Sequence, residues 1–435
     1  MTGQRFRKSG KVWLRKLLAV TLEVKQVRDI ADIAVGIREI LLFLILDYTI
    51  NLQLRSSLCT IMKRITLITL AITAIFLASV SCRKNNLESD DPIVPQGEVT
   101  REFLSRIRVG KDGNFQYWNQ DSPALKELKA FVATVTDPNC KGYVPPQDRV
   151  ATFDVDGTLM CETAPYYFNW MLFFHRYLHD DSFTPKDEND RRLAAEMEEY
   201  VLANRASKKD WGPLQQELQA KGFRGMTDVE FSEYVRNFIN SENVVGLSNL
   251  KWGTALYWPM IEVISYLMAN DFVVFLCSGV DRDVCRVIAE DIYEIPKYHM
   301  IASDVNYVLE HQGQWVEMIN SENYNYLPGE EVWRGDFMQL NTAVNKIIKM
   351  RRELGQKPIL SWGNSGGDYP MFHYTNNDNI YPHISFCLLC DDTVRELGNE
   401  TKANNCKAEC EKNGWIPVSM KKEWWTIYGP QVERN

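Results

Sequence analysis

Residues 149–158, RVATFDVDGT, decide the fold of this chain. A short apolar run ends in two aspartates, Asp154 and Asp156, which are followed by Gly157 and Thr158. Such a run is typical of a buried strand in a parallel sheet, and open α/β sheets place their ligand chemistry at the carboxyl ends of strands. The stretch therefore predicts a central strand that carries two carboxylates into a site. The alternative is an ordinary strand-to-turn exit, because Asp and Gly are common turn residues.

Two later apolar runs also end in residues that suit the binding of a charged ligand. They are residues 272–279, FVVFLCSG, and residues 358–371, PILSWGNSGGDYPM. A lysine on a predicted helix lies between them. The residues that these segments contribute are Ser278, Gly279, Lys346, Asn364, Ser365 and Asp368.

The order of predicted elements favours one α/β domain with a long helical insertion. Strands are expected at 149–155, 272–276, 300–303, 358–362 and 384–389, and helices at 101–135, 259–270, 281–292 and 338–354, with a possible hairpin at Gln312-Gly313. This alternation predicts a Rossmann-like parallel sheet covered by helices on both faces. Residues 101–160 and 256–430 would form the core. Residues 161–255, rich in charges and helix formers, would form an inserted helical cap.

Four motifs in this order resemble those of the haloacid dehalogenase (HAD) superfamily of phosphoryl-transfer hydrolases. The family shows DxDGT, a strand ending in Ser or Thr, a Lys, and an acidic G(D/N)xxxD-type loop. The bacterial phosphoserine-phosphatase-like branch is more similar still. It shows FDxDGTLWCE, SG, K…RPIxAFGNSDGDxxML and GWxxxxMKxDW, where this chain has FDVDGTLMCE, CSG, K…KPILSWGNSGGDYPMF and GWIPVSMKKEW. The resemblance covers about residues 100–428.

The resemblance implies roles for the first three motifs. Asp154 would be the nucleophile that forms an aspartyl-phosphate, and Asp156 would protonate the leaving oxygen and then activate water. Ser278 and Gly279 would bind the phosphate, with the Gly279 N–H at a helix start. Lys346 would neutralise the charge of phosphate and nucleophile.

The resemblance also implies a Mg²⁺ site formed by Asp154, the Asp156 carbonyl and the acidic loop. Asn364 stands where many relatives have an Asp, which leaves open whether Asn364 or Asp368 contacts the metal. Glu162, at the mouth of the cap, is a candidate for substrate recognition; a surface charge is the alternative reading.

The function expected from these residues is a Mg²⁺-dependent phosphomonoesterase that acts on a small phosphorylated metabolite. Two alternatives stay open: a different specificity, such as phosphonate cleavage or phosphotransfer, and a non-catalytic binding lipoprotein on the same scaffold. A dehalogenase is disfavoured, because that chemistry has no leaving-group oxygen for Asp156 to protonate. The residues predict neither the substrate nor an oligomeric state.

The composition is that of a globular protein and argues against some kinds of partner. The chain has 435 residues, 45% of them hydrophobic and 24% charged, as in a globular protein with a substantial core. Its formal net charge of -8 argues against nucleic acid as a partner, because that binding depends on Lys and Arg neutralising phosphates.

The N-terminal part contains a pattern typical of a lipoprotein-type signal peptide. Residues 62–82, MKRITLITLAITAIFLASVSC, have a basic start, an apolar run and small residues before Cys82. Residues 83–100 would be a flexible tether, and residues 1–61 an upstream extension of the reading frame without function. We expect an exported protein of the bacterial envelope, periplasmic or surface-exposed, anchored by lipid at Cys82. The alternatives are a short transmembrane anchor and a genuine basic N-terminal region.

Eight cysteines follow Cys82. The last four, Cys387, Cys390, Cys406 and Cys410, have zinc-like spacing. A β-rich run around the first two would place them on opposite faces of a strand, which disfavours zinc. A disulfide in an oxidising envelope is the other expectation.

Overall fold

The computed structural model describes residues 93–95, 97–161, 167–203, 211–310 and 326–435. These residues belong to one compact unit, Asp91–Asn435. The signal-like segment, Cys82, Glu162 and the Gln312-Gly313 turn lie outside the described residues. Within the described ranges, no helix combines the length and the apolar character needed to cross a bilayer.

Seven strands form one sheet, in the order β5-β4-β3-β1-β6-β7-β8. Neighbouring strands are parallel except for β4 and β5, which form an antiparallel pair. The bounds are β1 Val150–Phe153, β3 Val273–Asp281, β4 Met300–Leu309, β5 Val332–Gln339, β6 Leu360–Gly363, β7 Ile384–Leu389 and β8 Ile416–Ser419. The predicted α/β class is confirmed, with β1 at the centre of the sheet.

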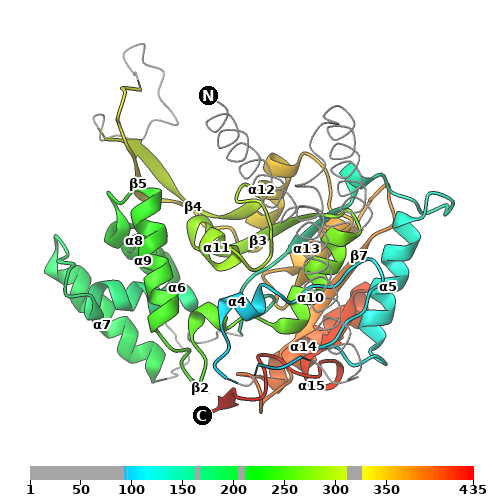
Figure 1. The fold of residues 1–435 in the computed structure, drawn as a ribbon. Helices are drawn as coiled ribbons and strands as arrows, with labels where there is room; N and C mark the ends of the chain where they lie inside the picture. The colour runs from blue at the N-terminus through cyan, green and yellow to red at the C-terminus, as the bar shows by residue number, and fades with distance from the viewer. Residues whose placement is uncertain (1–92, 96, 162–166, 204–210, 311–325) are drawn as a thin grey trace, which may run out of the picture. The chain divides into compact units, whose positions relative to one another are not determined.

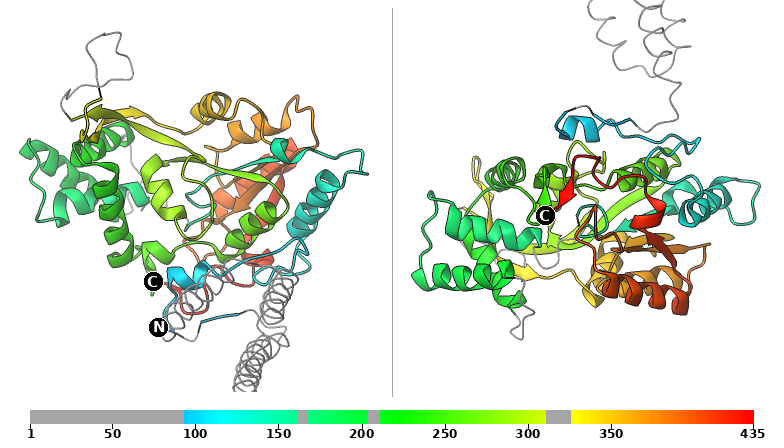
Figure 2. Two further views of the ribbon diagram at one scale, coloured as in Figure 1. Left: turned by 45° about the horizontal axis from the view of Figure 1, so that its top comes forward. Right: turned by 90° about the horizontal axis from the view of Figure 1, so that it is seen from below.

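Helices cover both faces of the sheet (Figures 1 and 2). One face carries α5 (Pro123–Thr136), α10 (Trp258–Ala269) and α11 (Arg282–Ala289), whose apolar residues belong to the larger core cluster. The other face carries α12 (Val344–Leu354), α13 (Tyr369–Asn376) and α14 (Glu400–Asn413), which pack in a second cluster. This burial on both sides explains why most residues of the central strands are apolar.

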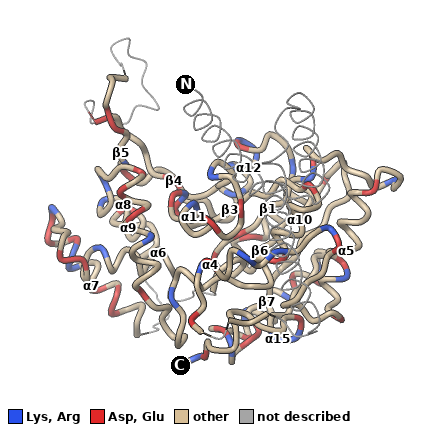
Figure 3. Tube along the Cα trace, in the orientation of Figure 1, with Lys and Arg blue, Asp and Glu red and all other residues tan. Residues whose placement is uncertain are grey.

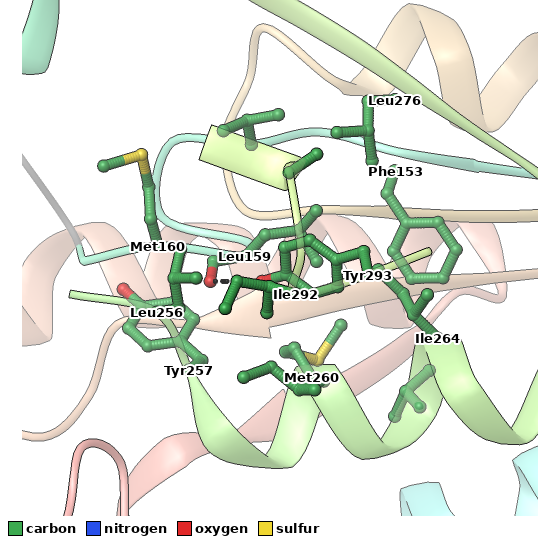
Figure 4. Packing of buried hydrophobic residues seen from close by; sticks show 14 of the residues in the cluster. Phe153, Leu159, Met160, Leu256, Tyr257, Met260, Ile264, Leu276, Ile292 and Tyr293 are labelled. Carbon is green, nitrogen blue, oxygen red and sulfur yellow. Dashed lines mark hydrogen bonds between the residues drawn. The ribbon is translucent and has the colours of Figure 1, made fainter. Parts of the chain in front are cut away.

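The larger cluster anchors the turn that follows β1. Phe153 and Leu276 pack with Ile264 of α10, and the Tyr293 hydroxyl donates a hydrogen bond to the Leu159 carbonyl at 3.2 Å (Figure 4). Leu159 comes directly after the DGT turn and is fully buried. Burying a side chain of this size contributes about 1.5–3 kcal/mol, so the turn that carries the two aspartates is fixed to the core.

The insertion between β1 and β3 is helical and has an apolar cluster of its own. It contains α6 (Phe168–Phe174), a π-helical turn (His175–His179), α7 (Glu188–Leu202), α8 (Gly212–Phe223) and α9 (Asp228–Ser241). Thr227 and Glu230 form a capping box that begins α9. Acidic and basic residues are interspersed along α7 (Figure 3), as expected of a solvated helix.

The β4–β5 hairpin joins this insertion to the sheet. The Arg334 amide donates to the Met226 carbonyl, and the Gly225 amide donates to the Arg334 carbonyl, both at 2.8 Å. The Arg334 side chain is buried, lies over the Phe231 ring of α9 and pairs with Asp281 of β3. One side chain therefore links the helical insertion, the hairpin and the strand that carries Ser278.

Some predicted bounds are wrong. The helix expected at 101–135 is two helices, α4 (Arg101–Leu104) and α5, because residues 105–122 form a loop. The helix expected at 338–354 begins only at Val344, since residues 332–339 pair with β4 as strand β5. The remaining short elements are η1 Pro146–Asp148, β2 Leu247–Ser248, η3 Trp252–Thr254, α15 Met420–Glu423 and β9 Glu433–Arg434.

Candidate active site

The candidate site lies at the carboxyl ends of β1, β3 and β6. Phe153 of β1 is in register with Leu276 of β3 and Trp362 of β6. Asp154 is the next residue, and its amide donates to the Trp362 carbonyl at 2.9 Å. Parallel register therefore brings the ends of three strands to one level of the sheet, at the point where ligands bind in open α/β folds.

A tight turn then presents Asp156. Gly157 has φ +71°, in the left-handed region, which costs other residues about 1–2 kcal/mol. Its amide donates to the Met160 carbonyl at 3.0 Å, and the Thr158 amide donates to the Val155 carbonyl at 3.1 Å. Asp156 is partly exposed and lines the same cavity as Asp154.

Lys346, on the first turn of α12, lies between two carboxylates. Its Nζ donates to Asp154 Oδ1 at 2.6 Å and to Asp368 Oδ1 at 2.6 Å. Lys346 is only 2% exposed. Lys349, three residues further along the same helix, instead donates to the Ala302 carbonyl and to Asp304, both at 2.6 Å.

Burial and mutual charge shift the pKa values of Asp154 and Lys346. Burial raises the pKa of Asp154 to about 7; the Asp368 charge adds to this effect, and Lys346 opposes it. Burial alone would lower the pKa of Lys346, but the charges of Asp154 and Asp368 outweigh it and raise that pKa. Lys346 is therefore an ammonium at every working pH, while the ionisation of Asp154 depends on the positive charge near it.

The loop after β6 is organised by Asp368. Its Oδ2 accepts hydrogen bonds from the Asn364 amide at 2.9 Å, the Ser365 amide at 3.1 Å and the Ser365 hydroxyl at 3.2 Å. A Cβ built on Gly363 would lie 2.5 Å from Asp368 Cβ, so only glycine allows this approach. Both oxygens of Asp368 thus accept hydrogen bonds from the protein itself. Asp368 and Asn364 both line the cavity.

Ser278 and Gly279 lie inside β3, and α11 begins only at Arg282. The expectation that the Gly279 N–H lies at a helix start is therefore wrong, because β3 continues past it to Asp281. The Ser278 hydroxyl accepts from the Val280 amide at 3.2 Å. Both residues line the cavity beside Asp154.

Asn341, which sequence analysis did not identify, supports the segment that contains Ser278. This buried side chain donates from Nδ2 to the Ser278 carbonyl at 3.1 Å and to the Ile301 carbonyl at 2.7 Å. A single buried Asn in an apparent helix carries no recognisable pattern, so only the fold reveals this role.

These residues form the floor of a cavity of about 330 Å³, which is in the range of small-molecule sites. Its opposite wall comes from the helical insertion. The residues on that wall and at the rim that sequence analysis did not identify are Tyr167, Asn169, Trp170, Gln215, Gln216, Thr342 and Lys402. Amides and aromatics on helices follow no fixed spacing, so no sequence signal marked them.

The donor set fits a hard divalent cation. Asp154, Asp156 and Asp368 supply three carboxyl groups against the one ammonium of Lys346, and the oxygens that line the cavity are carboxylate, amide, carbonyl and hydroxyl oxygens. Within the described ranges, no three His, Cys, Asp or Glu side chains form a metal cage. Mg²⁺ needs none, because it retains several waters and takes one or two protein carboxylates.

The eight cysteines of the described chain are free thiols, so the disulfide expectation is not met. Cys387, Cys406 and Cys410 are buried together in the second apolar cluster. The Cys390 thiol instead approaches the Leu397 carbonyl at 3.7 Å. The four residues with zinc-like spacing therefore do not share one centre.

No protein-family model matches the chain, and no curated protein matches it in sequence. Solved structures that resemble it include a conserved protein of unknown function from Anaerococcus prevotii, with 11% identity and a TM-score of 0.42 over 72% of this chain and 96% of that one. Cytosolic 5'-nucleotidase IIIB bound to cytidine has 10% identity and a TM-score of 0.41 over 69% and 88%.

A phosphoserine phosphohydrolase-like protein from Francisella tularensis has 14% identity and a TM-score of 0.30 over 55% of this chain and 87% of that one. At these identities and scores, the similarity by itself carries no conclusion about the reaction, which has to be argued from the residues of the site.

Proposed function

We propose that this chain is a Mg²⁺-dependent phosphohydrolase of the HAD type, which cleaves a small phosphate monoester through an aspartyl-phosphate on Asp154. One observation carries the proposal. Lys346 contacts both Asp154 and Asp368 on the floor of a cavity that also contains Asp156 and Ser278. Residues from all four motifs, up to about two hundred positions apart, therefore meet in one place.

In the first half of the reaction, an Asp154 carboxylate oxygen attacks phosphorus. The bond between phosphorus and the ester oxygen breaks, and Asp156 gives its proton to the departing alcohol. Lys346 and the amides around Ser278 and Gly279 offset the negative charge of the phosphoryl oxygens. Most of the catalytic effect would come from such positioning and charge, as in other phosphoryl transfers.

In the second half, Asp156 takes a proton from a water that attacks the same phosphorus. The bond between phosphorus and Asp154 breaks, which releases inorganic phosphate and restores the Asp154 carboxylate. Asp156 is suited to both tasks because it lines the cavity on the turn next to the nucleophile.

Asp154, the Asp156 carbonyl and the Asn364 side chain are the groups that we propose would hold Mg²⁺. The ion would supply positive charge for the transferring phosphoryl group. Asp368 would act beside it by holding Lys346 and the loop through the hydrogen bonds that its two oxygens accept. The raised pKa of Asp154 agrees with a site that is completed by a further positive charge.

The test is hydrolysis of an aryl phosphate by the full chain, with Mg²⁺ present, chelated and restored. Activity should depend on Mg²⁺, and rapid acid quenching with labelled substrate should leave phosphate on the peptide that contains Asp154. Asp154→Asn is the matched control, since it is nearly isosteric and removes the nucleophile. Activity above a few per cent in that variant, without deamidation by mass spectrometry, would exclude the aspartyl-phosphate route.

We also propose that the protein is exported and anchored by lipid at Cys82. The support is the order of a basic start, an apolar run and small residues before that cysteine. Stable anchoring takes more than one acyl chain, which a di- or triacylated cysteine provides.

A further inference from the structure

We infer that Asn341 and Ser303 are positioning residues of the phosphate subsite. They hold the carbonyls of Ser278 and Gly279, and thereby turn the N–H groups of the same two peptide bonds toward the cavity. This inference rests on the proposed phosphatase function and adds two residues that none of the four motifs contains. It comes from the way in which β3 leaves its regular pairing with β4 at the site.

A bulge interrupts the pairing of β3 with β4 at this point. Cys277 and Asp281 are four positions apart on β3, whereas their partners on β4 are only two positions apart. The peptide groups of Ser278 and Gly279, which lie between them, are therefore outside the regular ladder. Bulges occur next to active sites, where they redirect the groups of a strand, and buried peptide groups that lose their ladder partners need others.

Two side chains supply donors in place of the ladder. The Asn341 side chain, which is fully buried, donates from Nδ2 to the Ser278 carbonyl at 3.1 Å and to the Ile301 carbonyl at 2.7 Å. The Ser303 hydroxyl donates to the Gly279 carbonyl at 2.7 Å and accepts from the main-chain amide of Asn341 at 2.9 Å. Both carbonyls of the bulge are thus held on the side of β3 that faces β4.

The N–H groups of these two peptide bonds face the other way. The carbonyl and the N–H of a trans peptide point in opposite directions, so the amides of Gly279 and Val280 are turned from β4 toward β1, the neighbour of β3 on its other side. Asp154 follows β1, and Ser278 and Gly279 line the same cavity as Asp154. The Val280 amide donates to the Ser278 hydroxyl at 3.2 Å. Successive amides on one side of a chain form a concave donor pair that binds anions, which suits a phosphoryl group.

Asn341 also links this subsite to Lys346. It lies between β5 and α12, and its neighbours Leu340 and Thr342 line the cavity. Lys346 follows on the first turn of α12, where its amide donates to the Ala343 carbonyl at 3.1 Å. The Oδ1 atom of Asn341 is buried without a hydrogen-bond partner among the described residues. An unpaired buried acceptor lowers stability, so the positioning of its neighbours explains this side chain better than a net gain in stability does.

The first experiment replaces Asn341 by leucine, which has a similar volume and no donor. Turnover of an aryl phosphate and binding of inorganic phosphate, measured by calorimetry, are compared in the full chain with Mg²⁺. We expect kcat to fall and the Kd of inorganic phosphate to rise, each by about tenfold or more, because the donors of the subsite lose their preorganised direction. A merely structural role predicts instead a loss of stability, with kcat per folded molecule and the phosphate Kd unchanged.

Asn379→Leu is the matched control. Asn379 also donates from Nδ2 to two carbonyls, those of Pro358 and Thr375 at 2.9 and 2.8 Å, but it lies outside the cavity. Its replacement should lower stability and leave kcat per folded molecule and the phosphate Kd near the parent values. Equal losses of kcat in the two leucine variants, or a parent-like kcat and Kd in folded Asn341→Leu, would overturn the inference.

Ser303 gives a second test, which decides the matter if circular dichroism shows that Asn341→Leu does not fold. Ser303→Ala removes the hydroxyl and should weaken phosphate binding by about fivefold. Ser303→Thr keeps the hydroxyl, and its additional methyl group has room in a small cavity of about 20 Å³ beside this residue. The threonine variant should therefore bind phosphate as the parent does. Equal phosphate affinity of the alanine and threonine variants counts against the inference.

The two proposals fail in different ways. Absence of aryl phosphate hydrolysis by the parent chain would refute the phosphatase function itself, whereas calorimetry tests the phosphate subsite without turnover. A parent chain that does not bind inorganic phosphate would refute the subsite and with it the inference. Hydrolysis by the parent, together with unchanged phosphate binding in the folded Asn341→Leu and Ser303→Ala variants, would leave the phosphatase function standing and refute only the positioning inference.

Discussion

Replacing Lys346 by methionine separates the contribution of this residue to stability from its proposed contribution to the reaction rate. Methionine keeps most of the volume and removes the ammonium, so Asp154 and Asp368 would face each other without a counter-charge. Each contact is 2.6 Å long, and at an effective dielectric constant of about 20 it corresponds to about 6 kcal/mol of Coulomb attraction.

The net cost is smaller, because desolvation of the three groups already offsets part of this attraction. Loss of one partner from a buried ion pair typically costs about 3–5 kcal/mol of unfolding free energy. We expect a loss of that size for Lys346→Met, moderated where one carboxylate takes up a proton. The rate should fall by about 10²-fold or more, as when a charge-stabilising donor is removed from an active site.

Lys349→Met is the matched control. Lys349 lies on the same helix, is as deeply buried, and also has its ammonium group bound at 2.6 Å, but to Ala302 and Asp304. Its removal should cost less stability, because Arg282 still neutralises Asp304 at 2.6 Å. It should leave kcat per folded molecule near that of the parent.

Urea denaturation gives the stabilities, and aryl phosphate turnover gives kcat. Adding Asp368→Asn to Lys346→Met should recover part of the stability and none of the rate, because it removes one of the two facing charges. The reasoning is refuted if Lys346→Met keeps more than a tenth of kcat, or if both lysine variants lose the same activity per folded molecule.

Three further predictions concern Asp156, the proposed Mg²⁺ site and the signal-like segment that ends at Cys82. Asp156→Asn should slow alkyl phosphates more than aryl phosphates, because poor leaving groups need the proton; equal losses in a leaving-group series would show that Asp156 is not the acid. Asn364→Ala should raise the Mg²⁺ concentration for half-maximal rate by about tenfold with little change in stability. Asp368→Ala should also lower the unfolding free energy by about 3 kcal/mol. Mg²⁺ titrations and urea curves measure these two effects, and the opposite pattern would contradict the assignment. Cys82→Ser should move the protein from the membrane to the soluble fraction of a bacterial envelope with its kcat retained, and recovery of unlipidated parent protein would contradict the anchor.

The residues on the floor of the cavity could be predicted from sequence, because the proposed chemistry requires fixed residue types at strand ends. The turn after β1 and the glycine at 363 follow from backbone geometry, so they leave a local pattern. Lys346 could be chosen over Lys349 only from its distance to the loop, and the structure places Lys346, not Lys349, against Asp154.

The opposite wall could not be predicted, because nothing local distinguishes its residues. Asn169 and Gln216 lie on helices where an amide usually faces solvent, and they line the cavity only because the insertion packs on the β4–β5 hairpin. Long-range pairing also explains the wrong prediction near residue 338, where a helix start was expected and strand β5 pairs with β4. Glu162 lies outside the described residues, so its role stays a prediction.

The central position of β1 has a consequence for how the chain reaches its native state. Ala151 pairs with Val274 on one side and with Leu360 on the other, more than two hundred residues further along. Sheets built from such distant pairings fold slowly. During synthesis, one edge of the apolar strand β1 stays unpaired until β6 has been made. Fragments that end before residue 360 should therefore aggregate through that open edge, and chaperone binding at residues 149–155 would be the protection that the growing chain needs.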